Sequence, residues 1–296
     1  AIGAIAKWVN PADININWAT FKEYLSQIEQ LRLGVNYGSF VGYGTLRRGV
    51  MKNQIRPATV QERQEIIYLL SSALEEGAFG LSLGLSYGHE RVSGTDEVIE
   101  IARTLGPTGG IIKIHLRSEG KELLAAVNEV VRIGRETGIP IQISHFKAIG
   151  RRVWHLEKNA RELLVHARES GVDIDIDISP YATTGSPLYT LIPAWARQGG
   201  LSELFRRIDD PENKQRIIEE LKPYTLHYEK ILVISATVKS IVGKTLVQIA
   251  EQGGLVPEEA LLNTIRANEG RVTIIGRTVS QKNTIRAIQD PLAMIA

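Results

Sequence analysis

The sequence predicts an α/β protein built on a parallel sheet, and two observations support this. Short β-branched runs recur along the chain, and each is followed by a polar or glycine-rich stretch and then by an amphipathic segment of helical length. Each run also has an apolar body and ends in polar residues. A barrel or an open α/β sheet uses this polarity at the carboxyl ends of its strands to build an active site.

The first part of the chain follows this pattern closely. A strand is expected over Val35–Val41, followed by a glycine loop at Gly42 and Gly44 and by a helix over Thr59–Glu76. Thr59 and Glu62 are spaced as a capping box, and Gly77 is a suitable helix end. Further strands are expected over Phe79–Leu83, Gly110–Leu116, Pro140–His145 and Val172–Ile178, and helices over Asp96–Leu105, Lys121–Glu136 and Ala160–Ser170.

The regularity weakens after Tyr181. Residues 187–270 are interpreted as an elaboration within a single domain over residues 1–296. The elaboration includes helices over Pro211–Leu221 and Pro257–Ala267 and a strand-like run over Lys230–Ser235, and two more strand-like runs follow over Val272–Ile275 and Ala293–Ala296. Roughly six strands are of the barrel type, so a complete eight-stranded barrel would need strands that this sequence does not contain.

Composition excludes several classes of function. The 296 residues are 43% hydrophobic and 23% charged, as in an ordinary globular protein. The net charge is +2, and the basic residues are spread along the chain rather than clustered, so no nucleic-acid partner is expected. The chain has no apolar run near the ~20 residues of a membrane span, and its start, AIGAIAKWVN, lacks the features of a signal peptide. A cytoplasmic location is the resulting expectation, while the oligomeric state is not indicated.

The chain contains no cysteine, which excludes disulfides and thiolate metal ligands. Any metal must be held by His, Asp, Glu or a modified Lys. His115 ends the run IIKIH and His145 ends the run IQISH, so each is placed at the carboxyl tip of a strand. Neighbouring strands are ~4.8 Å apart, close enough for two imidazoles to share a metal ion. The alternative is that one or both are hydrogen-bonded structural histidines.

Other polar residues near these strand ends have two interpretations each. Arg117 could clamp a substrate carboxylate, or it could pair with Glu119 or a helix end. Tyr181 and Ser186 could donate to an oxyanion or contact substrate, or the tyrosine could be a packing residue. The aspartates of the fifth strand share one face and are poor candidates for surrounding an ion; they are Asp173, Asp175 and Asp177.

Two motif classes are excluded. The segment Gly42-Tyr43-Gly44 lacks the third glycine and the spacing of a dinucleotide fingerprint, and no Gly-x-Ser-x-Gly nucleophile elbow is present. The remaining histidines have no partner at ligand spacing; they are His89, His155, His166 and His227.

An ordered series of segments resembles the N-acyl-D-amino-acid deacylase (D-aminoacylase) family of the amidohydrolase superfamily. The series covers roughly Trp18 to Ala296 in matching order, which makes it more specific than any single motif. The segments are VGYGTLR, EEGAFGLSLGLSY, TDEVIEIAR, IHLRSEG, IPIQISHFKAIGR, SPYATTGS, GKTLVQIA and DPLAMIA.

This resemblance implies a (β/α)8 TIM-type barrel of a metal-dependent hydrolase, with a Zn2+ cofactor. Its substrate would be a small N-acyl-D-amino acid, cleaved at the amide bond to a D-amino acid and a carboxylate. The resemblance also implies site roles for residues of the matching motifs: His115 and His145 as metal ligands, and Tyr87, Arg117, Lys147, Tyr181 and Ser186 at the substrate.

The sequence also departs from the family pattern. The His-x-His pair of the first barrel strand and the bridging Cys of the second are absent, and the catalytic Asp of a Ser-Asp-Gly motif is expected beyond Ala296. Tyr43 stands where many members have His, and Ser179 where Tyr is usual. The barrel is therefore expected to be incomplete at both ends, without strands one and two and the small β-domain. The alternatives are a hydantoinase- or dihydroorotase-like cyclic-amide hydrolase and a non-catalytic barrel remnant.

Overall fold

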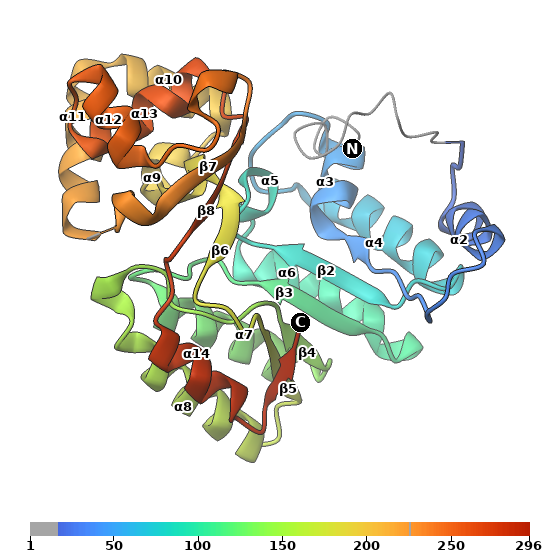
Figure 1. Ribbon diagram of the computed structural model, residues 1–296. Helices are drawn as coiled ribbons and strands as arrows, with labels where there is room; N and C mark the ends of the chain where they lie inside the picture. Colours follow the sequence, from blue (N-terminus) through green and yellow to red (C-terminus); the bar gives the residue numbers. More distant parts are fainter. Residues whose placement is uncertain (1–16, 225) are drawn as a thin grey trace. The chain divides into compact units, whose positions relative to one another are not determined.

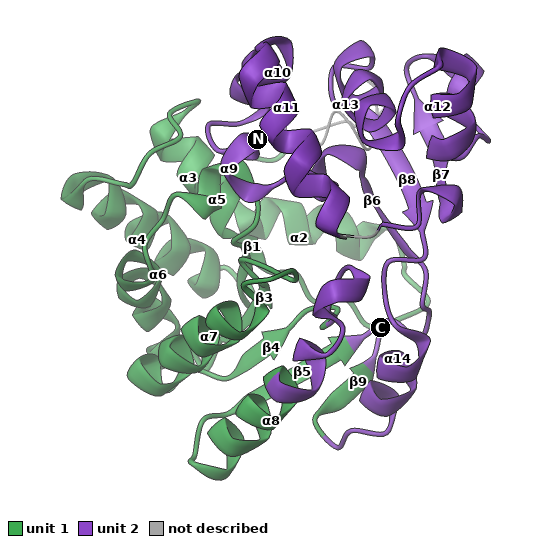
Figure 2. Cartoon of the chain, turned by 90° about the vertical axis from the view of Figure 1, so that its left-hand side faces the viewer, with its two compact units in different colours: residues 1–146, 160–177, 292–294 green, residues 147–159, 178–291, 295–296 purple. Residues whose placement is uncertain are grey.

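The structure is a computed structural model that describes residues 17–224 and 226–296. The chain divides into two compact units (Figure 2). Unit 1 comprises residues 1–146, 160–177 and 292–294, and unit 2 comprises residues 147–159, 178–291 and 295–296. Within the described ranges, no helix has the length and apolar character that crossing a bilayer requires. The N-terminal segment AIGAIAKWVN lies outside the described residues.

Unit 1 is an α/β structure whose strands alternate with helices. Three of its elements, α8, β5 and β9, also include residues assigned to unit 2. The strands are β1 (Val41–Gly42), β2 (Gly80–Gly84), β3 (Ile111–His115), β4 (Ile141–Ile143), β5 (Ile174–Ile178) and β9 (Ala293–Ile295). The helices are α2 (Phe21–Gln30), α3 (Tyr43–Met51), α4 (Val60–Glu75), α5 (Gly88–Arg91), α6 (Thr95–Ala102), η2 (Arg103–Thr108), α7 (Leu123–Thr137) and α8 (Leu156–Glu169).

The strands form one six-stranded sheet in the order β1-β2-β3-β4-β5-β9, and β1 to β5 pair in parallel (Figure 1). The sequence prediction of an α/β fold with a parallel sheet is confirmed. Closure into a TIM-type barrel stays a prediction, because the described sheet contains six strands. The expected domain limits, including an elaboration over residues 187–270, also stay a prediction.

The register of the sheet places apolar and polar residues in separate rows. Leu81, Ile112, Ile141 and Ile174 are paired neighbours along one row, and all four are buried. The next row is polar; it contains Ser82, Lys113, Gln142 and Asp175. Since side chains alternate across a strand, the two rows point to opposite faces. One face is therefore apolar, and the polar face leads toward the carboxyl ends of β3 and β4.

Helix α4 begins as the sequence predicts. The Thr59 side chain accepts a hydrogen bond from the Glu62 backbone, and Glu62 returns one to the Thr59 N–H. The first expected strand and its loop differ from expectation. The strand is confined to Val41–Gly42, and helix α3 begins where the glycine loop was expected. Gly44 fits there because the Glu90 carboxylate approaches so closely that a Cβ at Gly44 would lie 2.5 Å from its oxygen.

Unit 2 contains a second, three-stranded sheet in the order β6-β8-β7, in which both pairings are antiparallel. Its own apolar core is built from residues such as Leu188, Val233, Leu261 and Ile274. The strands are β6 (Thr184–Pro187), β7 (Ile231–Ala236) and β8 (Val272–Gly276). The helices are η3 (Arg151–Val153), η4 (Leu188–Leu191), α9 (Ala194–Arg197), α10 (Leu201–Asp209), α11 (Pro211–Leu221), η5 (Lys222–Tyr224), η6 (Tyr228–Lys230), η7 (Lys239–Ile241), α12 (Leu246–Gly253), α13 (Pro257–Ala267) and α14 (Gln281–Ile288).

Candidate metal centre

Two histidines meet at the carboxyl ends of neighbouring strands in unit 1. His115 is the last residue of β3, and His145 follows β4 by two residues. Because β3 and β4 pair in parallel, the two rings come together with centroids 4.7 Å apart. Nδ1 of His115 lies 2.9 Å from Nε2 of His145. The proximity predicted from the sequence is present, while the role of the two histidines as ligands stays a prediction.

Glu119 completes a cluster that could hold a metal ion. One ligand atom from each of His115, Glu119 and His145 lies within 4.8 Å of the others. Oε1 of Glu119 is 3.1 Å from Nδ1 of His145. Sequence reasoning named Glu119 only as a polar neighbour and a possible partner of Arg117. Its position four residues after a strand-end histidine was the available signal.

The donor set fits a zinc ion. Imidazole nitrogens and a carboxylate are ordinary zinc ligands, and two nitrogens on one tetrahedral zinc are roughly 3.3 Å apart. The 2.9 Å between the two ring nitrogens approaches this separation. The His145 side chain is 41% exposed and that of Glu119 is 10% exposed. Glu119 is therefore held within the protein, whereas His145 is accessible to small molecules.

The backbone of His145 is held in an uncommon conformation. Its φ of +40° lies in the left-handed region, which costs free energy for a residue with a Cβ. The carboxylate of Asp177, on β5, accepts a hydrogen bond of 2.5 Å from the His145 backbone N–H. The same carboxylate accepts a hydrogen bond of 2.8 Å from Nζ of Lys113. Asp177 thus connects three neighbouring strands and fixes the segment that carries His145.

Two of the predicted substrate residues belong to unit 1. The ring of Tyr87 stacks on His115 with centroids 5.2 Å apart, so it lies beside the cluster. The guanidinium of Arg117 donates two hydrogen bonds to Glu129, of 2.9 and 2.7 Å, and others to the backbone oxygens of Arg91 and Ser93. These contacts use each of its three nitrogens, which favours a structural role over a substrate clamp. Its role at the substrate stays a prediction.

The other three predicted substrate residues belong to unit 2. Lys147 is partly buried and Tyr181 is exposed. Ser186 lies on β6, and its hydroxyl oxygen accepts a hydrogen bond of 3.2 Å from Thr190. Their roles at a substrate stay predictions.

Glu90, on α5, is a buried carboxyl that no signal in the sequence singles out. It accepts a hydrogen bond from the backbone N–H of Gly84, the residue that pairs with His115 in the sheet. Burial raises the pKa of Glu90 from its ordinary value of 4.5 to about 7, despite the opposing effect of hydrogen bonds from Gly84 and Gly44 and of nearby arginines.

This shift predicts a pH-dependent stability. Glu90 keeps its proton to higher pH in the folded protein than in the unfolded chain. Its contribution to the free energy of unfolding is therefore full below pH 4.5 and is lost as the pH rises through about 7. In the wild type, Glu90 should lower the free energy of unfolding by about 3 kcal/mol as the pH rises from 4.5 to about 7. We expect this decrease to be absent in Glu90→Gln. Urea denaturation of metal-free protein at several pH values measures it. Glu65→Gln, at an exposed position of α4, is the control, and an unchanged pH profile in Glu90→Gln would contradict the prediction.

The fold and the site together define an α/β protein with a candidate metal centre at the carboxyl ends of two parallel strands. No family model matches the chain. The chain is 34% identical over 168 residues to a D-aminoacylase from Alcaligenes xylosoxydans xylosoxydans, a match that covers 57% of this chain and 34% of the relative. The resemblance expected from the sequence is thereby confirmed.

Solved structures agree in fold. The N-acyl-D-glutamate deacylase of Bordetella bronchiseptica, complexed with zinc and a phosphonate inhibitor, superposes with a TM-score of 0.78 at 24% identity, covering 99% of this chain and 53% of that one. A D-aminoacylase with a binuclear metal centre superposes with a TM-score of 0.73 at 25% identity, covering 94% and 51%. This chain therefore spans about half the length of the solved proteins that it matches.

Proposed function

We propose that this chain is the metal-binding part of a hydrolase that cleaves the amide bond of N-acyl-D-amino acids. The observation that carries the proposal is the cluster of His115, Glu119 and His145 at the carboxyl ends of β3 and β4. Support comes from the 34% identity to a D-aminoacylase, which spans 168 residues.

The proposed metal is zinc, held by His115 and His145. When bound, zinc supplies Lewis-acid chemistry that polarises an amide carbonyl and activates water. A neutral histidine carries its proton on one ring nitrogen only. A proton on Nδ1 of His145 would be donated to Oε1 of Glu119, so that Nε2, which faces Nδ1 of His115, would be unprotonated. Glu119 then orients His145, as carboxylates beside metal-bound histidines commonly do.

The remaining roles concern the substrate. Tyr87 provides an aromatic wall next to His115. Lys147, Tyr181 and Ser186 are proposed to contact the carboxylate and carbonyl oxygens of the substrate, because an ammonium and two hydroxyls can donate hydrogen bonds to them.

The proposal is tested by amide hydrolysis. The 296-residue chain and the protein expressed from the whole reading frame that encodes it are loaded with zinc. Each is assayed for free amine released from N-acetyl-D-leucine and N-acetyl-D-glutamate. We expect hydrolysis of at least one D substrate, with the L enantiomers at least ~10-fold slower. A zinc-loaded full-length protein that hydrolyses neither D substrate, or that hydrolyses hydantoin instead, would contradict the proposal. The His145→Ala variant controls for contaminating activity.

A further inference from the structure

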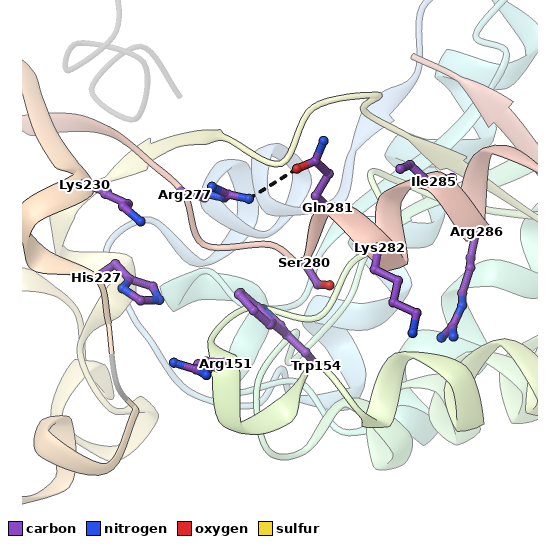
Figure 3. Close-up of a pocket in the computed structure, with 10 residues that line it drawn as sticks. All are labelled: Arg151, Trp154, His227, Lys230, Arg277, Ser280, Gln281, Lys282, Ile285 and Arg286. Atoms are coloured by element: carbon purple, nitrogen blue, oxygen red, sulfur yellow. Dashed lines mark hydrogen bonds between the residues drawn. The ribbon is translucent and has the colours of Figure 1, made fainter.

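Unit 2 contains a pocket of about 750 Å³ that the proposed hydrolase activity does not use. The described residues that line it all belong to unit 2. They come from three separate segments: the residues before α8, the residues before β7, and the chain from the end of β8 into α14 (Figure 3). A volume of this size is in the range of small-molecule sites.

The lining of the pocket is strongly basic. No Asp or Glu is among the described residues that line it, and its basic members are Arg151, His227, Lys230, Arg277, Lys282 and Arg286. Of these, His227 has a carboxylate partner, because its Nδ1 lies 3.1 Å from Oε1 of Glu229. Within residues 17–224 and 226–296, no ion pair is formed by Arg151, Lys230, Lys282 or Arg286. Arg277 donates a hydrogen bond of 3.3 Å to the neutral side chain of Gln281 (Figure 3). Cations that converge without carboxylates repel one another, and an anion in the pocket would relieve this repulsion.

Helix α14 adds to the positive potential. Its first turn contains Lys282 and no acidic residue, although anionic side chains are the ones that stabilise this end of a helix. The helix N-terminus and the lysine therefore present positive charge to the same pocket. Ser280 caps the helix by accepting a hydrogen bond of 3.3 Å from Asn283, which fixes the turn from which Lys282 projects.

The pocket is held together by hydrogen bonds between its segments. Nε1 of Trp154 donates to the backbone oxygen of Thr278 at 3.1 Å, and the backbone N–H of Gly150 donates to the same oxygen at 3.0 Å. The Asn283 side chain donates to the backbone oxygen of Trp154 at 2.7 Å. The arginine-bearing loop and the start of α14 are thus joined before any ligand binds, which lowers the entropic cost of binding.

We infer that this pocket binds a small molecule carrying two linked phosphate groups. Arginine pairs with phosphate oxygens through two parallel hydrogen bonds, and lysine and a helix N-terminus are common phosphate partners. The five arginines and lysines of the lining carry more positive charge than a single phosphate dianion neutralises, and the volume leaves room for a second phosphate. Trp154 offers an apolar wall for the rest of the molecule, so a free pyrophosphate and a nucleoside diphosphate are the two sources of this chemistry.

The test is calorimetric titration of the zinc-loaded chain with sodium pyrophosphate and with ADP, at constant ionic strength. The variant Lys230→Gln/Lys282→Gln removes two pocket lysines, and Lys239→Gln/Lys244→Gln removes one exposed and one partly buried lysine of unit 2 outside the pocket. We expect saturable binding by the wild type that weakens at least ~10-fold in the pocket variant, equivalent to ~1.4 kcal/mol, and less than ~2-fold in the control. Tighter binding of ADP than of pyrophosphate would identify the nucleotide as the source, and the reverse would identify pyrophosphate.

Three results would overturn the inference. The first is no saturable binding of either compound. The second is equal weakening in both double variants, or equal binding of sodium sulfate, since either would mean general attraction of anions to a basic surface. The third is binding that survives in the pocket variant and disappears in His145→Ala, because the phosphates would then be bound to the metal of unit 1. None of these results depends on whether the chain hydrolyses an amide.

Discussion

The purified chain is expected to lose its bound zinc when His145 is replaced by alanine. His145 places a ring nitrogen 2.9 Å from that of His115, and its other ring nitrogen contacts Glu119. Its removal leaves only the His115 imidazole and the Glu119 carboxylate, without the side chain that links them. Loss of an outer residue beside a metal commonly weakens binding 10–100-fold, and loss of a direct ligand costs more. We expect about one zinc per chain in the wild type and less than about 0.1 in the variant, measured by elemental analysis after dialysis.

The matched control is His166→Ala, which removes a histidine from an 82% exposed position on α8. It should retain the zinc content of the wild type. Equal zinc in His145→Ala and the wild type would show that the ion binds elsewhere. A parallel loss in both variants would indicate loosely bound surface metal.

Replacing Asp177 is the second substitution expected to have a large effect. Its carboxylate is the acceptor for the backbone N–H of His145, whose φ of +40° needs external support. Asp177→Ala leaves this N–H and the Lys113 ammonium without their acceptor. We expect the free energy of unfolding to fall by about 1–3 kcal/mol and zinc affinity to fall ~10–100-fold, measured by urea denaturation and by competition with a chelator.

Asp175→Ala is the comparison, since Asp175 lies on the same strand and pairs instead with Arg168. It should leave zinc affinity within about 3-fold of the wild type. Asp177→Asn adds a second distinction, because an amide oxygen can still accept from His145 while the charge opposite Lys113 is lost. Affinity restored toward the wild type in Asp177→Asn supports a positioning role. Zinc affinity that is unchanged in Asp177→Ala would contradict it.

Much of the fold could be predicted from the sequence, because local signals determine it. The capping box of Thr59 and Glu62 starts helix α4 as expected, and the expected helices Pro211–Leu221 and Pro257–Ala267 have the observed bounds. In both of the latter, a proline in the first turn marks the start. The strand expected over Val35–Val41 is observed only as β1, Val41–Gly42. An apolar run alone does not provide a pairing partner for a strand.

The site was predictable only in part, for a physical reason. His115 and His145 could be paired from sequence because each ends an expected strand, although β4 stops two residues before His145, and consecutive parallel strands are usually neighbours. Glu119 and Asp177 were missed because their roles depend on where a side chain reaches across the sheet. The two aspartates of β5 look equivalent in sequence, yet Asp177 is buried and accepts from the His145 backbone while Asp175 pairs with Arg168.

The central claim is that His115 and His145 jointly hold a metal ion, and anomalous diffraction at the zinc edge tests it most directly. Crystals of the zinc-loaded chain are expected to show one dominant peak about 2.0–2.1 Å from a ring nitrogen of each histidine, with Glu119 either bound to the ion or hydrogen-bonded to His145. A fully occupied zinc ion that contacts neither histidine would contradict the account.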